Sequence, residues 1–471
     1  MRKVLAGMLM IAGAAAGLAA KAQGQTANVR VAQAQPNKWE VPNCGLEKGN
    51  FLIGSGATYI ATGTQQSDAA KRAHQFSEAV RVVTDGISKG QAGMSGAWYY
   101  LGRAYLYQGN LVGADTALTR AQQLAPSCTK DIQTTRRISW IPLVNAGVQF
   151  MKDKNTDSAV VLFQQANRIY QGEPNAYTNL GVLYNSIDQP DSAIAYFQKA
   201  VTAAGTDSAG AETRDQSQYN LAALLSNQGR WPQAVAAWQQ YLTWKPNDVD
   251  GKKAYARALR ASGQPDAASE IERGLIASGS AEVSTDDLMT AGVNFFNDKN
   301  YAEAAETFGR VVQREPWNRD ALFNMANSYL GAGNGPELVK AGTALHTIDP
   351  MNENSLKLLA QGYQLEKNKD MTIKLYTELE ALPASLTVTE VTLQAGGGKV
   401  AGTAVGREAR TIDTKPIAPH PVTVVFEFLN KDMAVVATSE RVIPSLNPGQ
   451  SSAFEAEGLG AGIVGWRYHA K

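Results

Sequence analysis

Cysteine and histidine are scarce in this sequence. Two cysteines and four histidines occur among 471 residues. The histidines (His74, His346, His420 and His469) are not spaced as the ligands of a metal site or as members of a catalytic triad. Nucleophile-elbow and phosphate-loop motifs are also missing. The sequence therefore indicates no catalytic, metal-binding or cofactor-binding residues, and we expect a protein that is not an enzyme.

An excess of charge of one sign is missing as well. The 44 Lys and Arg residues are balanced by 43 Asp and Glu residues, which gives a formal net charge of +1. Proteins that bind nucleic acid generally carry a basic excess. We therefore expect no nucleic acid among the partners.

Long hydrophobic runs are confined to the N-terminus. Arg2 and Lys3 precede an uncharged apolar stretch over 4–19, and Ala20-Lys21-Ala22 fits the cleavage pattern of a secretory signal. We interpret residues 1–22 as a signal peptide and 23–40 as a disordered linker; an uncleaved anchor is the alternative. No later run is long enough to span a bilayer, so the mature protein is expected in the periplasm or outside the cell.

Export changes how the two cysteines are interpreted. Cys44 and Cys128 would lie in an oxidising compartment, where a disulfide is permitted. Cys44 precedes the first expected helix, and Cys128 follows the second helix of the next pair. A bridge between them would hold the N-terminal end of the helical region together. The alternative is two unpaired thiols.

Small residues recur at a fixed interval along most of the chain. Residues 147 and 181, and residues 326 and 360, are 34 positions apart. A small side chain at such a position lets two helices approach closely. The series consists of Gly102, Gly147, Gly181, Ala222, Ala256, Gly292, Ala326 and Ala360.

The residues around this series resemble the tetratricopeptide repeat, whose pattern is W-x2-L-G-x2-Y followed by A-x3-F and P. The first copy has Trp98, Leu101, Gly102 and Tyr105, and it ends at Pro126. The resemblance covers residues 93–382 in about eight copies. It implies helical hairpins that stack into an α-solenoid, a right-handed superhelix with a concave groove.

A degenerate helix pair is expected before the repeats, in residues 41–92. Gly54 and Ala79 stand where the repeats have small residues, so they are predicted to lie at the contact between the two helices. The segment that separates the helices is longer than the family pattern has. We therefore interpret this pair as an N-terminal cap.

The periodicity changes from helical to alternating after Pro383. Segments such as LTVTEVTLQ and PVTVVFEFLN are typical of strands. Residues 383–471 are therefore predicted to form a small β-sandwich, with a hairpin turn at 430–433. This tail also resembles FxLYD-type extracytoplasmic modules, although Met433 stands where those often have glycine.

A row of asparagines is the strongest candidate for partner binding. In this family the sixth residue of the first helix faces the groove, and here it is Asn145, Asn179, Asn220 and, later, Asn324. A side-chain amide can donate to one backbone carbonyl and accept from one backbone N–H. A row of amides can therefore hold an extended peptide, as the resemblance to asparagine-ladder proteins implies. The alternative is that these asparagines only support the helix pairs.

Other residues in the same register are also expected to face the groove. Lys253, Arg257 and Arg260 form a basic stripe that suits a carboxylate or an acidic peptide, with an ordinary solvated face as the alternative. Tyr, Phe and Arg are frequent in binding hot spots. The remaining candidates are Tyr99, Arg103, Tyr107, Tyr219, Phe296 and Phe323.

Together these features predict an exported, non-enzymatic scaffold whose groove binds a peptide or protein partner in the cell envelope. The β-sandwich either docks a second partner or caps the array. Two alternatives remain. One is a structural envelope component whose groove is filled by its own segment, for example 204–213, and the other is an accessory subunit of an envelope enzyme complex.

Overall fold

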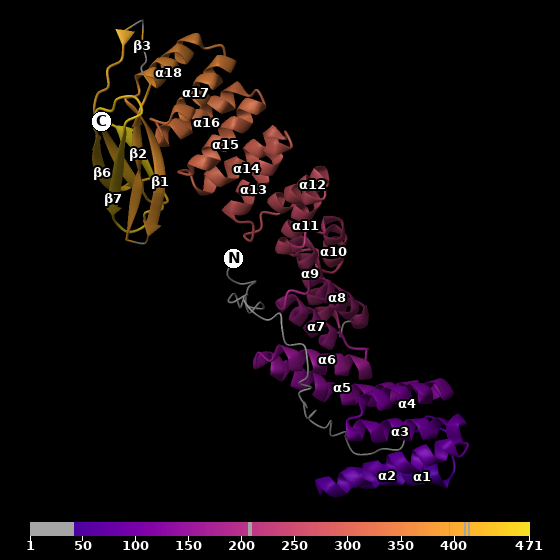
Figure 1. Ribbon diagram of the computed structural model, residues 1–471. Coiled ribbons are helices and arrows are strands. Elements are labelled where there is room, and N and C mark those ends of the chain that lie inside the picture. The colour runs from indigo at the N-terminus through magenta and orange to yellow at the C-terminus, as the bar shows by residue number, and fades with distance from the viewer. Residues whose placement is uncertain (1–41, 206–209, 395, 409–410, 413–414) are drawn as a thin grey trace. The chain divides into compact units, whose positions relative to one another are not determined.

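The computed structural model of the chain describes residues 42–205, 210–394, 396–408, 411–412 and 415–471. Eighteen α helices precede eight strands among these residues (Figure 1). The predicted fold class, an α-solenoid followed by a small β domain, is confirmed. The predicted signal peptide and linker, residues 1–40, lie outside the described residues.

The chain divides into two compact units, residues 1–224 and 225–471, and the boundary falls inside helix α9. The helices that begin in the first unit are α1 (Phe51–Gln65), α2 (Ala69–Ser88), α3 (Ser95–Gln108), α4 (Leu111–Leu124), α5 (Thr129–Lys152), α6 (Thr156–Ile169), α7 (Asn175–Ser186), α8 (Pro190–Ala204) and α9 (Ala211–Asn227). The second unit contains α10 (Trp231–Trp244), α11 (Val249–Ala261), α12 (Pro265–Ala277), α13 (Thr285–Asn297), α14 (Tyr301–Arg314), α15 (Arg319–Gly331), α16 (Gly335–Ile348), α17 (Glu353–Leu365) and α18 (Lys369–Ala381).

The small residues of the repeat allow the two helices of a hairpin to touch. A Cβ atom at Gly181 would lie 2.6 Å from the ring of Phe197, and one at Gly292 would lie 2.6 Å from the ring of Phe308. No real Cβ approaches so closely, so only glycine fits at these two positions. Gly102 and Gly147 meet the second helix of their hairpins in the same way.

Polar turns join the helices of a hairpin. Before α6, Lys154 takes a positive φ of 58°, and the side chain of Asn155 then accepts a hydrogen bond from the backbone N–H of Ser158. The asparagine satisfies one of the donors that a helix start leaves unpaired. Asn110, Asn334 and Asn368 cap α4, α16 and α18 in the same way.

The N-terminal pair, α1 and α2, corrects two expectations. Gly54 is exposed, and a Cβ there would meet nothing within 4 Å; instead, Gly56 lies at the helix contact, where a Cβ would lie 2.2 Å from Val83. The segment between the helices is also short, residues 66–68. Glycines at 54, 56 and 63 in one helix left the contact position ambiguous in the sequence.

The C-terminal part forms two three-stranded antiparallel sheets, of order β1-β2-β7 and β6-β5-β8, and a short β3-β4 pair. The hairpin predicted at 430–433 joins β5 to β6, and Met433 adopts a φ of +63° there. The strands are β1 (Ala384–Gln394), β2 (Gly397–Gly406), β3 (Thr411–Ile412), β4 (Lys415–Pro416), β5 (Val422–Leu429), β6 (Val435–Ile443), β7 (Ser451–Leu459) and β8 (Gly465–Ala470).

The β domain shares one hydrophobic core with the last helices. Leu356 of α17 and Leu375 of α18 belong to the same buried cluster as Phe426 of β5 and Trp466 of β8. Met433 packs against a second cluster, formed by residues of α15, α16 and α17. The sandwich is therefore built into the end of the helical array, as Figure 1 shows for α16 to α18 and the strands.

Polar contacts fix strand β8 to the helices. The guanidinium of Arg319 lies 3.5 Å from the ring centroid of Trp466 and donates to its carbonyl oxygen at 3.0 Å. The hydroxyl of Tyr468 donates to the carboxylate of Asp349. Burial, together with the charge of Asp349, raises the pKa of Tyr468 well above its ordinary value. These groups are buried, so each depends on its partner across the junction.

Candidate partner-binding surfaces

Three of the predicted asparagines lie on the first helices of successive hairpins in the first unit. We call Asn145 of α5, Asn179 of α7 and Asn220 of α9 the amide row. Asn145 is exposed, and the other two are half-buried. The side chain of Asn220 also accepts a hydrogen bond of 3.0 Å from Gln216. All three asparagines retain exposed surface, so a ligand can reach them.

Exposed aliphatic side chains flank the amide row. Ile141 precedes Asn145 on α5 and is 38% exposed, and Val182 follows Asn179 on α7 and is 40% exposed. The hydroxyls of Thr178 and Ser217 are 2.8 Å apart and tie α7 to α9 on this side. Sequence reasoning missed the two aliphatic residues, although they fall one turn from the asparagines on the same helices.

The prediction for Tyr99 and Tyr107 of α3 is wrong. These side chains are 2% and 7% exposed. Tyr107 stacks on Phe76 of α2 at a centroid distance of 4.4 Å. Tyr99 lies 3.5 Å from the hydroxyl of Thr135, on the N-terminal extension of α5. Neighbouring helices thus cover the face of α3 that the repeat pattern leaves open.

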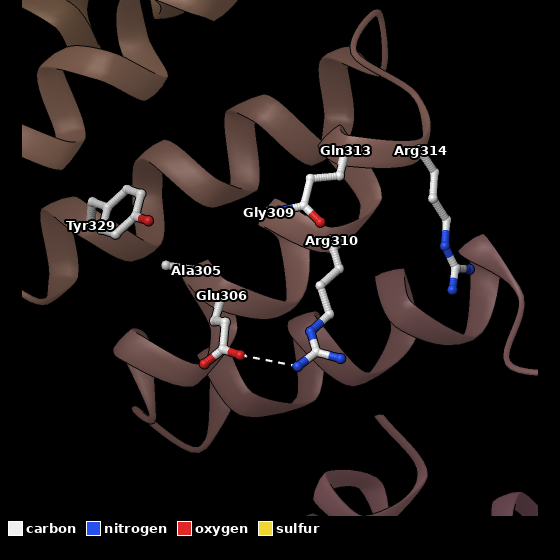
Figure 2. Close-up of a pocket in the computed structure, with 7 residues that line it drawn as sticks. All are labelled: Ala305, Glu306, Gly309, Arg310, Gln313, Arg314 and Tyr329. Atoms are coloured by element: carbon white, nitrogen blue, oxygen red, sulfur yellow. Dashed lines mark hydrogen bonds and ion pairs between the residues drawn. The ribbon is translucent and has the colours of Figure 1, made fainter. Parts of the chain in front are cut away.

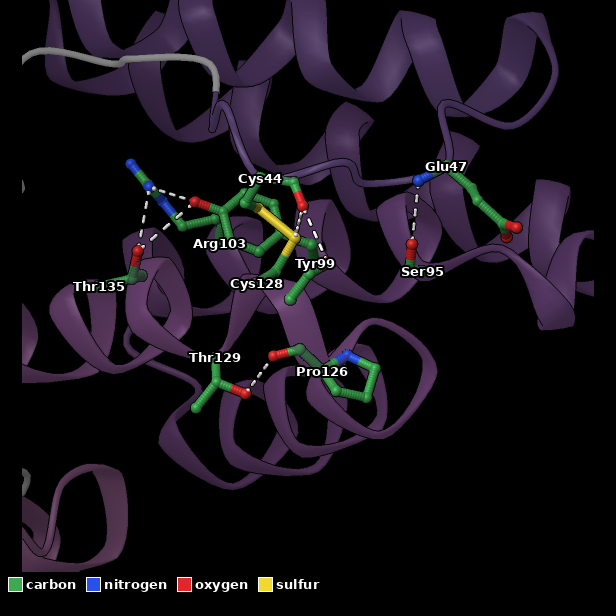
Figure 3. Close-up of a disulfide and its surroundings, with 10 residues drawn as sticks. Cys44, Glu47, Ser95, Tyr99, Arg103, Pro126, Cys128, Thr129 and Thr135 are labelled. Carbon is green, nitrogen blue, oxygen red and sulfur yellow. Dashed lines mark hydrogen bonds between the residues drawn. A yellow bond between two sulfur atoms is a disulfide. The ribbon is translucent and has the colours of Figure 1, made fainter.

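Arg103 of α3 is half-buried and contacts the same two tyrosines. It donates to the hydroxyl of Tyr99 at 3.0 Å (Figure 3) and to the hydroxyl of Tyr107 at 3.2 Å. Burial opposes its charge, but the two tyrosines outweigh burial and raise the pKa of the guanidinium. Arg103 therefore helps to hold the first hairpins together, and because it is half-buried, its contact with a partner stays a prediction.

The two cysteines lie next to this group. Cys44 and Cys128 form a disulfide with a Cα–Cα distance of 5.0 Å (Figure 3). The hydroxyl of Ser127 donates to the carbonyl of Cys44, and the hydroxyl of Ser95 accepts from the backbone N–H of Glu47. The extended segment before α1 is thus attached to the second hairpin.

In the second unit, the basic stripe of α11 is mostly neutralised. Lys253 pairs with Asp287 at 2.7 Å, and Arg260 pairs with Glu272 at 2.8 Å and Asp298 at 2.7 Å. Although burial disfavours their charges, these bonds raise the pKa of both cations, and the bond from Lys253 helps to lower that of Asp287. The expectation that the whole stripe receives a partner's carboxylate is therefore wrong for its two ends.

The other predicted residues differ in exposure. Phe296 of α13 is half-buried, with its ring 5.3 Å from that of Tyr301, and Tyr219 of α9 is half-buried as well. Phe323 of α15 is 37% exposed. Asn324 is half-buried on α15, in the second unit. Residues 206–209 of the segment predicted to fill the groove lie outside the described residues.

A cavity of about 560 Å³ lies beside α14 and α15 (Figure 2). Its two arginines are engaged: Arg310 bonds Glu306 and the carbonyl of Ile276, and Arg314 bonds the carbonyl of Val283. It is lined by Ala305, Glu306, Gly309, Arg310, Gln313, Arg314 and Tyr329. None of these residues was predicted from the sequence to bind a partner.

The described residues contain neither a candidate membrane span nor a candidate metal-binding cluster. No helix there combines the length and the apolar character that crossing a membrane requires. No cluster of three or more His, Cys, Asp and Glu side chains in the same residues is arranged to hold a metal ion.

Comparison with known proteins identifies the repeats. Residues 95–128 and 174–207 each match the tetratricopeptide repeat. No curated relative matches the chain. These two matches confirm the resemblance over α3, α4, α7 and α8.

Several solved structures resemble parts of the chain. MamA is 16% identical and covers 36% of this chain and 96% of its own, with a TM-score of 0.29. YrrB, described as a TPR protein with an unusual peptide-binding site, is 18% identical. It covers 46% of this chain and 97% of its own, with a TM-score of 0.31. PilF of Pseudomonas aeruginosa is 15% identical and covers 49% of this chain and 99% of its own, with a TM-score of 0.30.

Proposed function

Because two segments of the chain are tetratricopeptide repeats, we propose that this protein is a non-enzymatic interaction scaffold that binds an extended peptide segment of a partner. Repeats of this kind present long surfaces made by many helices. The single observation that carries the proposal is the amide row, Asn145, Asn179 and Asn220, exposed or half-buried on successive first helices.

The chemistry of the amide row suits a peptide backbone. Each amide offers a donor and an acceptor, and an extended backbone presents both at regular intervals. The nearby Ile141 and Val182 add apolar contact without demanding a particular side chain. Binding at this surface depends on the backbone of the ligand more than on its sequence.

We also propose export to the cell envelope. The apolar N-terminal stretch followed by Ala20-Lys21-Ala22 has the pattern of a signal peptide. A disulfide between Cys44 and Cys128 suits an oxidising compartment. The intact mass of the protein recovered from the envelope tests this: loss of residues 1–22 supports export, and a full-length cytoplasmic product contradicts it.

The binding proposal is tested with the variant Asn179→Ala/Asn220→Ala. The probe is a 12-residue peptide that the wild-type mature chain selects from a random library. We expect the affinity to fall about thirtyfold, because two hydrogen bonds of about 1 kcal/mol each are removed. N-methylation of the peptide backbone should weaken binding to the wild type in the same way.

A matched control separates binding from folding. Gln198→Ala removes an exposed amide from α8, the second helix of its hairpin, and should leave the affinity unchanged. The melting temperature of the double variant should equal that of the wild type. If the double variant binds the peptide as tightly as the wild type does, the amide row is not the binding surface.

A further inference from the structure

The basic stripe of α11 leaves one cation for a partner. Lys253 and Arg260 are paired with carboxylates of the protein itself. Arg257, which lies between them on the same helix face, is exposed and makes no hydrogen bond or ion pair with any described residue. A guanidinium has five N–H donors in a planar fork. This one presents them to solvent.

The two ion pairs also show what Arg257 faces. Lys253 reaches Asp287 at the start of α13, and Arg260 reaches Asp298 just after the end of α13. The two end residues of the stripe thus reach the two ends of α13. Arg257, which lies between them, is therefore beside the middle of that helix. Val293, in that middle, is 41% exposed.

The apolar surface continues onto the next first helix. Phe323 of α15 is 37% exposed, and its carbonyl accepts a hydrogen bond from the side chain of Asn327 at 2.9 Å. In the repeat register, Arg257, Val293 and Asn327 occupy the same position of three successive first helices, and Phe323 lies one turn earlier. One exposed cation and two exposed apolar side chains therefore lie on the same face of three successive first helices.

We propose that this face of α11, α13 and α15 binds a peptide segment of a protein partner in which one acidic side chain stands beside large apolar residues. Arg257 receives the carboxylate, and Val293 and Phe323 contact the apolar side chains. The inference rests on the proposed function, since it names the class of peptide that a second surface of the scaffold selects. Unlike the amide row, this surface selects by side chain.

The charges nearby favour a single carboxylate. Asp286 is exposed, and Asp250 and Asp287 flank Lys253. These carboxylates repel a run of acidic residues or a polyanion. A lone carboxylate that reaches Arg257 forms a charge-assisted, bidentate pair, and the neighbouring apolar contacts shield that pair from water. The ligand is therefore an apolar segment with one acidic residue.

A charge inversion tests the proposal. The mature wild type and the variant Arg257→Glu are each used to select 12-residue peptides from the same random library. We expect the wild type to enrich peptides with Asp or Glu next to Leu, Ile, Val or Phe. The variant should enrich Lys or Arg in place of the acidic residue. An unchanged charge preference overturns the proposal.

The apolar part has its own test. Val293→Ser/Phe323→Ser should weaken binding of the selected acidic peptide about tenfold or more, because burial of two apolar side chains is lost. Both residues are exposed, so the melting temperature should not change. Arg168→Glu, the same charge change at an exposed arginine of α6, is the matched control and should leave peptide selection unaltered.

The outcomes separate this inference from the proposed function. If Arg257→Glu has no effect but Asn179→Ala/Asn220→Ala still weakens peptide binding, the scaffold proposal stands and the acidic-apolar preference is wrong. If the wild type enriches no peptide at all, both proposals fail. If the charge preference inverts while the asparagine variant has no effect, the peptide surface is in the second unit alone.

Discussion

The first helix pair of the array is held by a covalent bond, whereas the last is held by a second domain. At the N-terminal end, the Cys44–Cys128 disulfide and the bond from Glu47 to Ser95 attach a short extended segment to the second hairpin. At the C-terminal end, Trp466 and Tyr468 of β8 enter the core of the last repeats.

The difference shows two solutions to one problem. Stacked repeats bury their faces against neighbours, so a terminal repeat needs another cover. The extended segment before α1, of about ten residues, buries too little apolar surface to stay in place alone. The disulfide compensates by reducing the conformational entropy of the unfolded chain. The β domain needs no covalent bond, because the core that it shares with the last helices fixes it.

Trp466→Ala should produce the largest loss. Removing a buried tryptophan leaves a cavity, costs about 4 kcal/mol, and also removes the ring below Arg319. Native-state hydrogen exchange should show faster opening in both the strands and α15 to α18. Val442→Ala, at an exposed valine of β6, should change hydrogen exchange neither in the strands nor in α15 to α18. Opening confined to the strands would show that the domain is separable from the repeats.

Cys44→Ser/Cys128→Ser should destabilise the other end by a smaller amount. Loop entropy alone gives about 4.5 kcal/mol for a separation of 84 residues, and disulfides typically contribute about 2–4 kcal/mol. We therefore expect a loss of about 3 kcal/mol, chiefly through the unfolded state. Exchange should accelerate in α1 to α4 and stay constant in α15 to α18. Reduced wild type should behave like the variant. Equal exchange in the oxidised wild type and the variant would show that hydrogen bonds alone hold this end.

Tyr468→Phe should cost about 2 kcal/mol at neutral pH, because Asp349 loses a buried donor. Because the pKa of Tyr468 is raised in the folded protein, the stability of the protein depends on pH. The folded state holds the proton of Tyr468 more tightly than the unfolded state does. The contribution of Tyr468 to the free energy of unfolding is therefore complete below the ordinary tyrosine pKa of about 10 and is lost as the pH rises above it. Alkaline melting curves measure this decline.

The alkaline decline should be weaker in Tyr468→Phe than in the wild type. Tyr376→Phe, at an exposed tyrosine of α18, is the control and should retain the full decline. If the curves of Tyr468→Phe and the wild type run parallel up to high pH, Tyr468 does not titrate across the junction.

Ser95→Ala should have the smallest effect, about 0.5 to 1 kcal/mol, because water can replace the hydroxyl at the exposed N–H of Glu47. Chemical denaturation followed by fluorescence measures it. Ser186→Ala, whose hydroxyl bonds only within α7, is the matched control. A loss above 2 kcal/mol would show that this hydrogen bond is as important as the disulfide.

The helical hairpins were predictable because their pattern is local. Gly181 and Phe197 meet across one short turn, and the alternation after Pro383 needs only neighbouring residues. The burial of Tyr99 was not predictable, because it depends on the helix extension that carries Thr135. Register gives the direction of a side chain but not the element that covers it.

The candidate site shows the same limit. The register placed the amide row and Arg257 on first helices, with surface that a ligand can reach. It did not show that Lys253 and Arg260 are paired, because their partners Asp287 and Asp298 lie 34 and 38 positions away, on the next hairpin. The aliphatic residues near the asparagines, Ile141 and Val182, were missed because single exposed aliphatic side chains are common.

The docking of β8 has a consequence for biosynthesis. Arg319 and Trp466 are 147 positions apart, and β8 is the last of the described elements to leave the ribosome. The hairpins can form one after another as the chain emerges, but α15 to α18 stay without their permanent neighbour until translation of this strand is finished. A product truncated before Gly465 should therefore expose the hydrophobic surface that β8 covers.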